Sequence, residues 1–151
     1  MPQIRASTPA LRIASEDPEA KETLLPVFNS WTTPNESFYV RSHFSDVPEI
    51  DPATYRLAIN GAVRTSLSLS YEALMGMPAE EIPVTMECAG NSRTSVYPPA
   101  EGLQFNHGAV GTAVWKGIPL ASLLARAGVD GSAVEVLFEG GDSGEEVEEG
   151  E

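Results

Sequence analysis

Residues 83–93 read Pro-Val-Thr-Met-Glu-Cys-Ala-Gly-Asn-Ser-Arg. Apolar and polar side chains alternate up to Cys88, which predicts a strand with one apolar face. Small residues follow Cys88 and let the backbone approach a bound group closely. The stretch therefore predicts a strand that ends at a cysteine, followed by a loop with room for a ligand.

Cys88 is the only cysteine in the chain. Behind it, Asn91 offers an amide donor and acceptor, and Arg93 offers a planar cation. A nearby cation favours the thiolate, which is the form of cysteine that binds metals. A lone cysteine is also commonly a buried apolar filler, and both roles stay open at this point. One cysteine excludes an internal disulfide, and no apolar run follows a basic start, so we expect a cytoplasmic protein.

Arg41 and His43 lie two residues apart in a predicted strand over 37–44 and share one face of it. Such a pair can hold an oxyanion, because arginine binds these groups bidentately. Spacing alone favours a surface salt bridge and a partly buried histidine instead. A zinc site from His43, Cys88 and His107 would have the three protein ligands of a catalytic site, but no short ligand spacing supports it. A cysteine–histidine nucleophile has the same weakness.

Strands with short helices between them predict an α+β fold with a mixed, mostly antiparallel sheet. Asn60-Gly61 suits the turn of a hairpin, Ser70 can cap a helix, and Gly128 can end another. Residues 1–25 show no firm periodicity. The expected elements include a hairpin over 55–59 and 63–69, short helices over 71–75 and 119–127, and a last strand face at Val134, Val136 and Phe138.

The net charge of −13 is concentrated at the C-terminus. Residues 139–151 hold seven acids, four glycines and no base, which leaves 15 acids against 9 bases elsewhere. Without a basic patch we expect no binding to nucleic acid. Without about 20 consecutive apolar residues we expect no membrane insertion. We divide the chain into a polar lead-in over 1–25, a domain over 26–138 and an acidic Gly/Glu-rich tail over 139–151.

Three segments resemble those of the sulfite oxidase and assimilatory nitrate reductase family. Residues 33–43, TPNESFYVRSH, resemble its TPNxxFFVRNH segment. Residues 86–93, MECAGNSR, resemble its LxCAGNxR segment, and residues 108–120, GAVGTAVWKGIPL, resemble its GAxGxAxWxGxxL segment. The three occur in the family's order and spacing and together cover roughly 31–138 of the chain.

The resemblance implies the sulfite oxidase fold with a molybdenum-molybdopterin cofactor. Cys88 falls on the cysteine whose sulfur ligates molybdenum. Arg41 and Arg93 fall on two arginines of the catalytic pocket, the first beside a small oxyanion substrate. The implied reaction is two-electron oxygen-atom transfer, with electrons leaving to a carrier such as a cytochrome. The stretch implied to contact the molybdopterin is Tyr39, Val40, Arg41, Ser42 and His43.

Two departures from the family pattern limit this expectation. Ser42 stands where the family usually has asparagine. The family's chain continues well past the position of Phe138 with further pterin-contacting residues, so we expect an incomplete catalytic domain with weak or absent cofactor retention. The alternatives are a non-catalytic binding or structural domain that keeps the fold, and a thiol-dependent hydrolase that uses Cys88 and a histidine.

Overall fold

The computed structural model describes residues 10–145, which fall into two compact units. Unit 1 is drawn from Met1–Val47, Pro83–Val114 and Asp142–Glu151, and unit 2 from Pro48–Ile82 and Trp115–Gly141. The strands are short and antiparallel, and the helices are few, as the α+β assignment predicts.

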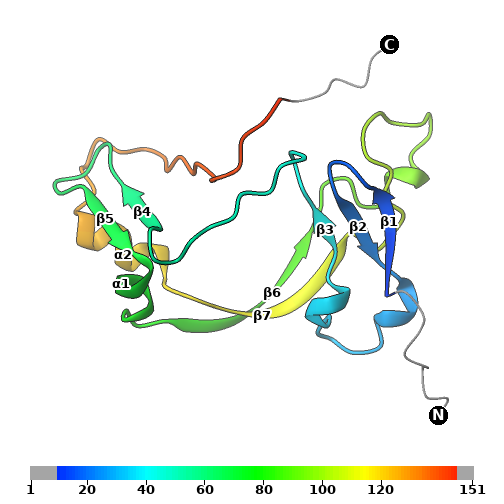
Figure 1. The fold of residues 1–151 in the computed structure, drawn as a ribbon, viewed down its shortest axis with the longest axis horizontal. Helices are drawn as coiled ribbons and strands as arrows, with labels where there is room; N and C mark the ends of the chain where they lie inside the picture. Colours follow the sequence, from blue (N-terminus) through cyan, green and yellow to red (C-terminus); the bar gives the residue numbers. More distant parts are fainter. Residues whose placement is uncertain (1–9, 146–151) are drawn as a thin grey trace. The chain divides into compact units, whose positions relative to one another are not determined.

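Unit 1 contains a three-stranded sheet of β1 (Leu11–Ser15), β2 (Ala20–Thr23) and β3 (Val40–Arg41), in which each pair is antiparallel (Figure 1). Two of these strands lie before residue 25, where the sequence shows no firm periodicity. On β2 the buried residues are Ala20, Glu22 and Thr23, and because two of them are polar the strand shows no apolar alternation. Hydrophobic periodicity therefore does not predict the β1–β2 hairpin.

The expected strand over 37–44 is largely wrong. A 3₁₀ helix, η2 (Asn35–Ser37), opens this segment, and β3 is two residues long. The N–H of Ser37 donates to the carbonyl of Pro34 at 2.9 Å, and the N–H of Phe38 donates to the carbonyl of Asn35 at 3.2 Å. These i to i+3 bonds close a tight turn that an extended chain cannot make. His43 consequently lies outside the strand that holds Arg41.

The strands β6 (Glu80–Glu87) and β7 (Val110–Gly117) form a two-stranded sheet. Within unit 1, the hydroxyls of Thr85 and Thr112 lie 2.7 Å apart, and the N–H of Cys88 donates to the carbonyl of Ala109 at 2.9 Å. The strand expected before Cys88 is confirmed, and it begins earlier, at Glu80. The glycine-punctuated segment after residue 108 forms β7, a strand that the sequence did not predict.

Unit 2 contains the antiparallel pair β4 (Arg56–Ile59) and β5 (Leu67–Ser70), with α1 (Tyr71–Met75) and α2 (Leu120–Ala127). The Ser70 hydroxyl accepts a hydrogen bond from the N–H of Ala73 at 3.1 Å, as an N-cap does. Gly128 ends α2 at φ +69°. Both helices and their capping residues are thus confirmed, and so is the pairing of two strands in a hairpin. The hairpin turn expected at Asn60-Gly61 is wrong, because Ile59 pairs with Leu67 and residues 60–66 join the strands. The returning strand consequently begins at Leu67 and not at residue 63.

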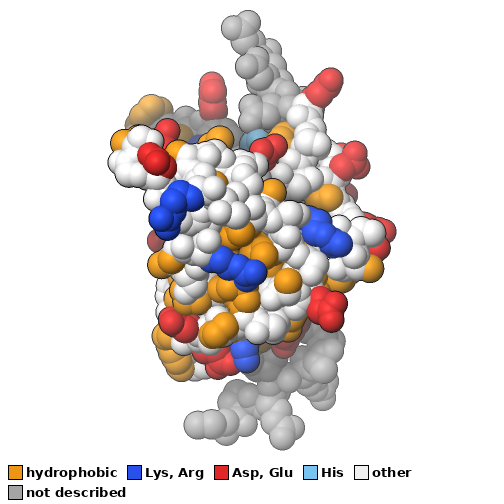
Figure 2. Space-filling view, turned by 90° about the vertical axis from the view of Figure 1, so that its left-hand side faces the viewer, with side chains coloured by type: hydrophobic (Ala, Val, Ile, Leu, Met, Phe, Trp, Pro, Cys, Tyr) orange, Lys and Arg blue, Asp and Glu red, His pale blue; other side chains and the backbone are white. Residues whose placement is uncertain are grey.

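The last strand expected over 134–138 is wrong, because no described strand covers these residues. Val134 is 94% exposed and Phe138 is 74% exposed. A sequence that alternates apolar and polar residues forms a β-ladder only where a neighbouring strand is available to pair with it. Figure 2 views unit 2 from one side and shows apolar side chains gathered between charged ones on its surface.

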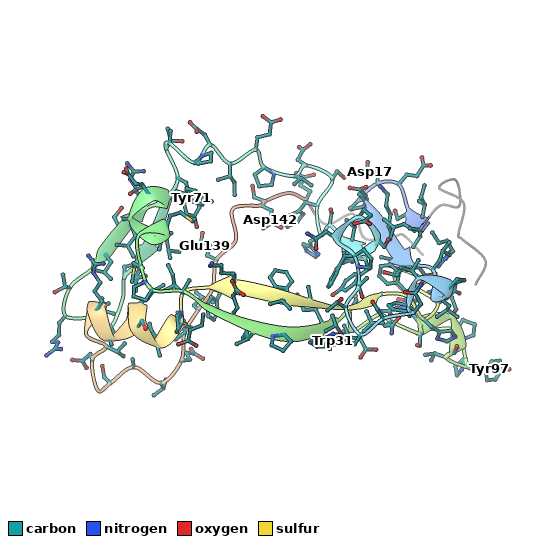
Figure 3. The ribbon with its side chains drawn as sticks, turned by 90° about the horizontal axis from the view of Figure 1, so that it is seen from below. Asp17, Trp31, Tyr71, Tyr97, Glu139 and Asp142 are labelled. Atoms are coloured by element: carbon teal, nitrogen blue, oxygen red, sulfur yellow. The ribbon has the colours of Figure 1, made fainter. Side chains whose placement is uncertain are left out.

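The core of unit 1 consists of Ala20, Phe105 and Ala109, all fully buried. Four partly buried residues pack against this cluster: Ala14, Tyr39, Cys88 and Leu103. Two short 3₁₀ helices complete the unit, η1 (Leu25–Val27) and η3 (Arg93–Ser95). At the unit's surface, Tyr97 and Trp31 point outward and are 93% and 68% exposed (Figure 3). Across residues 10–145, no helix has both the length and the apolar character that a bilayer span requires.

Candidate functional site

Cys88 sits directly after β6 and is half-buried against the core of unit 1. Its N–H donates to the carbonyl of Ala109 at 2.9 Å, and its Sγ accepts a hydrogen bond from the N–H of Gly90 at 3.5 Å. The thiol is therefore held in a defined turn while part of the residue stays accessible. A ligand for a bound metal needs both properties, whereas a core filler needs neither the turn nor the access.

Asn91 locks the turn that follows Cys88. Its Nδ2 donates to Oε1 of Glu87 at 2.8 Å, and its Oδ1 accepts from the N–H of Ala109 at 3.1 Å. Its own N–H donates to the carbonyl of Cys88 at 2.9 Å. Three hydrogen bonds thus join the end of β6, the turn and the residue before β7. The sequence singled out Asn91 as a polar group near a ligand, and the structure uses its amide to build the turn.

Tyr39 lies beside Cys88 and Glu87 in unit 1. Burial is the main cause that raises the pKa of the Tyr39 phenol, and the negative charges available to Cys88 and Glu87 raise the pKa further. The ring of Phe38 stacks on that of Tyr39 with centroids 5.4 Å apart. Gly111 allows this arrangement, because a Cβ there would lie 2.7 Å from the Phe38 ring. Of the five residues expected to contact the pterin, Tyr39 is the one that packs in the same cluster as Cys88.

The next four residues run from this cluster towards the surface. Val40 and Arg41 pair with Lys21 and Ala20 of β2. The guanidinium of Arg41 donates to the carbonyl of Ser42, and the N–H of Ser42 donates to the carbonyl of Glu19 at 2.9 Å. The ring of His43 meets that of Phe44 edge-on, with centroids 4.5 Å apart. Arg41 and His43 are both exposed, so their side chains are accessible to a ligand.

Arg93 folds back over the turn rather than against the thiol. Its Nη1 donates to the carbonyl of Glu101. A Cβ built on Gly90 or Gly102 would lie 3.3 or 3.2 Å from a guanidinium nitrogen, so both glycines make room for this cation. Its Nε is buried and has no hydrogen-bond partner within residues 10–145. Arg93 therefore keeps one donor for an acceptor that residues 10–145 do not supply.

Ser92 and His107 form a pair that the sequence did not predict. The Oγ of Ser92 and Nδ1 of His107 lie 2.9 Å apart. Ser92 adopts φ +65°, a left-handed conformation that side chains other than glycine rarely take. His107 uses Nδ1 in this contact, so the cysteine–histidine nucleophile gains no support from it. Within the described part of the chain, no group of three or more His, Cys, Asp or Glu side chains could hold a metal, and the zinc alternative therefore fails there.

Glu22 is a buried acid that the sequence did not single out. Its side chain is hydrogen-bonded to Arg12, to the N–H and Nδ2 of Asn106, both at 2.8 Å, and to the N–H of Gly108 at 3.3 Å. Burial alone would raise the pKa of this carboxyl, but Arg12 and the amides of Gly108 and Asn106 outweigh burial, and the pKa is lowered. Apart from Arg12, its partners lie 84 and 86 residues away along the chain, so local sequence carries no signal for these contacts.

Comparison with known proteins identifies the class to which this fold and site belong. Residues 43–150 match the family described as the oxidoreductase molybdopterin binding domain, and the chain belongs to this family. The match begins within the 26–138 domain expected from the sequence and extends into the acidic tail. Those domain boundaries stay a prediction.

Among individual relatives, mitochondrial sulfite oxidase of Rattus norvegicus is 43% identical over 143 residues, covering 89% of this chain and 26% of that protein. Nitrate reductase [NADH] 1 of Arabidopsis thaliana is 34% identical over 145 residues, covering 91% and 16%. The sulfane dehydrogenase SoxCD of Paracoccus pantotrophus matches in structure with a TM-score of 0.67 and 28% identity, covering 86% of this chain and 32% of that one. The chain spans about a quarter of the sulfite oxidases that it matches, and the fold expected from the sequence is confirmed.

Proposed function

We propose that this chain carries part of the catalytic domain of a molybdenum-cofactor oxidoreductase of the sulfite oxidase type, in which Cys88 supplies a ligand to molybdenum. The observation that supports this most directly is the single half-buried thiol at the end of β6, fixed by Ala109, Gly90 and Asn91. A lone thiolate suits a metal that already has sulfur ligands from its own cofactor. It does not suit an ion that needs several protein ligands.

The residues around Cys88 fit such a group. Gly90 and Gly102 leave space around the guanidinium of Arg93, whose Nε is buried with no partner among the described residues. An anionic group of the cofactor or substrate would satisfy that donor. When bound, the cofactor supplies two-electron oxygen-atom transfer, and the protein's part is to bind and orient the reacting groups.

We assign roles to the site residues on this basis. Tyr39 is protonated at neutral pH, since its pKa is raised further from the ordinary 10.0, so its phenol can donate a hydrogen bond beside Cys88. Arg41 is exposed and offers fixed positive charge to a small oxyanion substrate, and Arg93 offers its free Nε. Val40, Ser42 and His43 complete the stretch that would contact the pterin.

The remaining proposals concern the whole protein. We propose a small oxyanion substrate, because two arginines belong to the candidate site. We propose an electron carrier such as a cytochrome, because oxygen-atom transfer releases two electrons. We propose a cytoplasmic location, because a single cysteine cannot form an internal disulfide and fits a reducing compartment.

Molybdenum analysis tests the proposal. The full chain is expressed with a supply of molybdenum cofactor, purified and assayed for bound metal. Cys88→Ser is expected to lose molybdenum while keeping its circular dichroism spectrum, and Lys116→Gln, an exposed substitution in unit 2, is expected to retain it. Absence of molybdenum from the complete gene product with Cys88 intact would contradict the proposal, whereas weak retention by this chain alone is what an incomplete catalytic domain predicts. Such absence would favour the non-catalytic domain that keeps the fold.

A further inference from the structure

Glu22 combines deep burial with an unusual number of hydrogen bonds. The residue is 3% exposed. Arg12 lies directly opposite it in the β1–β2 pairing and forms an ion pair with its carboxylate. The other donors are the N–H and Nδ2 of Asn106 and the N–H of Gly108. Burying a carboxylate costs free energy, and such a group persists where several donors surround it.

A buried ion pair contributes little net stability compared with well-packed apolar residues of the same volume. The Glu22 carboxylate instead fixes the positions of its donors, because all of them must converge on its two oxygens. Asn106 and Gly108 flank His107, so one side chain fixes the backbone on both sides of that residue. The 106–108 segment is thereby tied to β2.

The same segment leads directly to Cys88. Ala109 follows Gly108 and is fully buried. Its carbonyl accepts from the N–H of Cys88 at 2.9 Å, and its N–H donates to Oδ1 of Asn91 at 3.1 Å. The amide held by Glu22 and the amide–carbonyl pair that holds the Cys88 turn thus belong to adjacent residues, Gly108 and Ala109.

The backbone leaves little freedom along this path. The N–H of Thr23 donates to the carbonyl of Gly108 at 2.9 Å, and a Cβ on Gly108 would lie 1.9 Å from the Thr23 carbonyl oxygen. β2 and Gly108 are therefore in direct backbone contact, and Glu22 adds the one charged connection beside that contact. A change in the Glu22 carboxylate must therefore shift the backbone segment that carries Ala109.

We propose that Glu22 is a positioning residue for Cys88: through Asn106 and Gly108 it sets the place of Ala109, and Ala109 sets the place of the Cys88 turn. The use of the positioned thiol as a metal ligand rests on the proposed function. The positioning itself does not depend on any bound metal. The sequence around Glu22 does not predict this role, because Asn106 and Gly108 belong to a distant segment of the chain.

Alkylation of Cys88 provides the test, since it is the only cysteine and every labelling event reports on it. Iodoacetamide labelling rates are measured on the metal-free full chain at one fixed pH over a urea series. At low urea the rate reports local opening around the thiol, and at higher urea it reports global unfolding. A residue that only stabilises the fold shifts the second regime and leaves the first unchanged.

Glu22→Gln removes the charge and presents an amide N–H₂ to donors, so labelling at low urea is expected to rise about tenfold or more. Glu22→Asp keeps the charge and shortens the reach, so a smaller rise is expected. Glu19→Gln removes an exposed charge from the same hairpin and should leave the rate at the wild-type value. Equal low-urea rates in Glu22→Gln and wild type would overturn the proposal.

Asn106→Ala covers the case in which Glu22→Gln does not fold. It removes one donor to Glu22 and leaves the charge, the Arg12 pair and the backbone donors in place. A rise in low-urea labelling supports the proposal, and an unchanged rate contradicts it. Molybdenum content of the wild-type chain is scored separately, so failure of the proposed function is distinguishable from failure of the positioning role.

Discussion

The N–H of Ala109 donates to Oδ1 of Asn91 at 3.1 Å, while Nδ2 of the same amide donates to Glu87 at 2.8 Å. One side chain therefore bridges the residue before β7 and the last residue of β6, across the turn that begins at Cys88. The candidate metal ligand sits inside a closed set of hydrogen bonds, and its geometry depends on residues outside the thiol itself.

We expect Asn91→Ala to destabilise the chain by about 1–3 kcal/mol, because the fully buried Ala109 would lose the acceptor of its N–H. Glu87→Gln is the matched control: the amide oxygen still accepts from Asn91, so a change within about 0.5 kcal/mol is expected. Urea unfolding followed by tryptophan fluorescence measures both. If the two variants unfold at the same urea concentration, Asn91 does not lock the turn.

Gly108→Ala is expected to be severely destabilising or to prevent folding. The added Cβ would lie 1.9 Å from the Thr23 carbonyl oxygen, which is backbone and cannot rotate away. Overpacking of this kind costs about 3 kcal/mol or more when the backbone must shift. Gly117→Ala, at a position with nothing within 4 Å of the added Cβ, serves as the control and should fold as wild type does. Thermal unfolding of the two variants gives the comparison.

Stability should fall on acidification because of Glu22. The pKa of this carboxyl is lowered from 4.5 in the folded chain, so the unfolded chain binds the proton more readily. The contribution is therefore fully present above pH 4.5 and is lost as the pH falls through the lower folded pKa. The free energy of unfolding is measured by urea titration at several pH values between neutrality and pH 3. A Glu22→Gln variant should show a shallower loss, and an identical slope would show that other carboxyls account for it.

Tyr39 should act in the opposite direction at alkaline pH. Its pKa is raised above 10.0 in the folded chain, so folding favours the protonated phenol. That contribution is fully present below pH 10.0 and is lost as the pH rises through the folded pKa. Tyr39→Phe cannot ionise, and its stability is expected to decline less above pH 10.0 than that of the wild type. Urea titrations at matched alkaline pH values test this, with Tyr97→Phe as the control because that ring is 93% exposed.

Local signals in the sequence predicted the elements that local physics controls. Ser70 caps α1 and Gly128 ends α2, because a hydroxyl acceptor and a residue tolerant of positive φ act within one turn. Cys88 was found through the alternation of β6 and the small residues behind it. Glu22 could not be found in this way, since its role comes from donors more than 80 residues away. Long-range pairing also explains why β7 was missed.

The family segments predicted candidate site residues, but they did not predict which atoms of the chain those side chains contact. Tyr39 packs against the same core cluster as Cys88, while its contact with a molybdopterin stays a prediction. Arg93 was expected near the substrate pocket, and this stays a prediction; its guanidinium lies against Gly90 and Gly102, a contact that the family segments did not predict. Which surface a long flexible side chain covers depends on the packing of a loop, and sequence spacing does not encode that packing.

Ser92 offers a final prediction, because its backbone and its side chain act in opposite directions. At φ +65° a serine is strained by about 1 kcal/mol relative to glycine. Its hydroxyl contact with Nδ1 of His107, at 2.9 Å, contributes a similar amount. Ser92→Ala keeps the strain and loses the contact, so it should be less stable than Ser92→Gly by about 1 kcal/mol, and wild type should lie near Ser92→Gly. Urea unfolding ranks the three. With only two histidines in the chain, the His107 ring resonance in an NMR spectrum, assigned with His43→Gln, should shift in both variants. An unchanged resonance would show that the hydroxyl does not hold the ring.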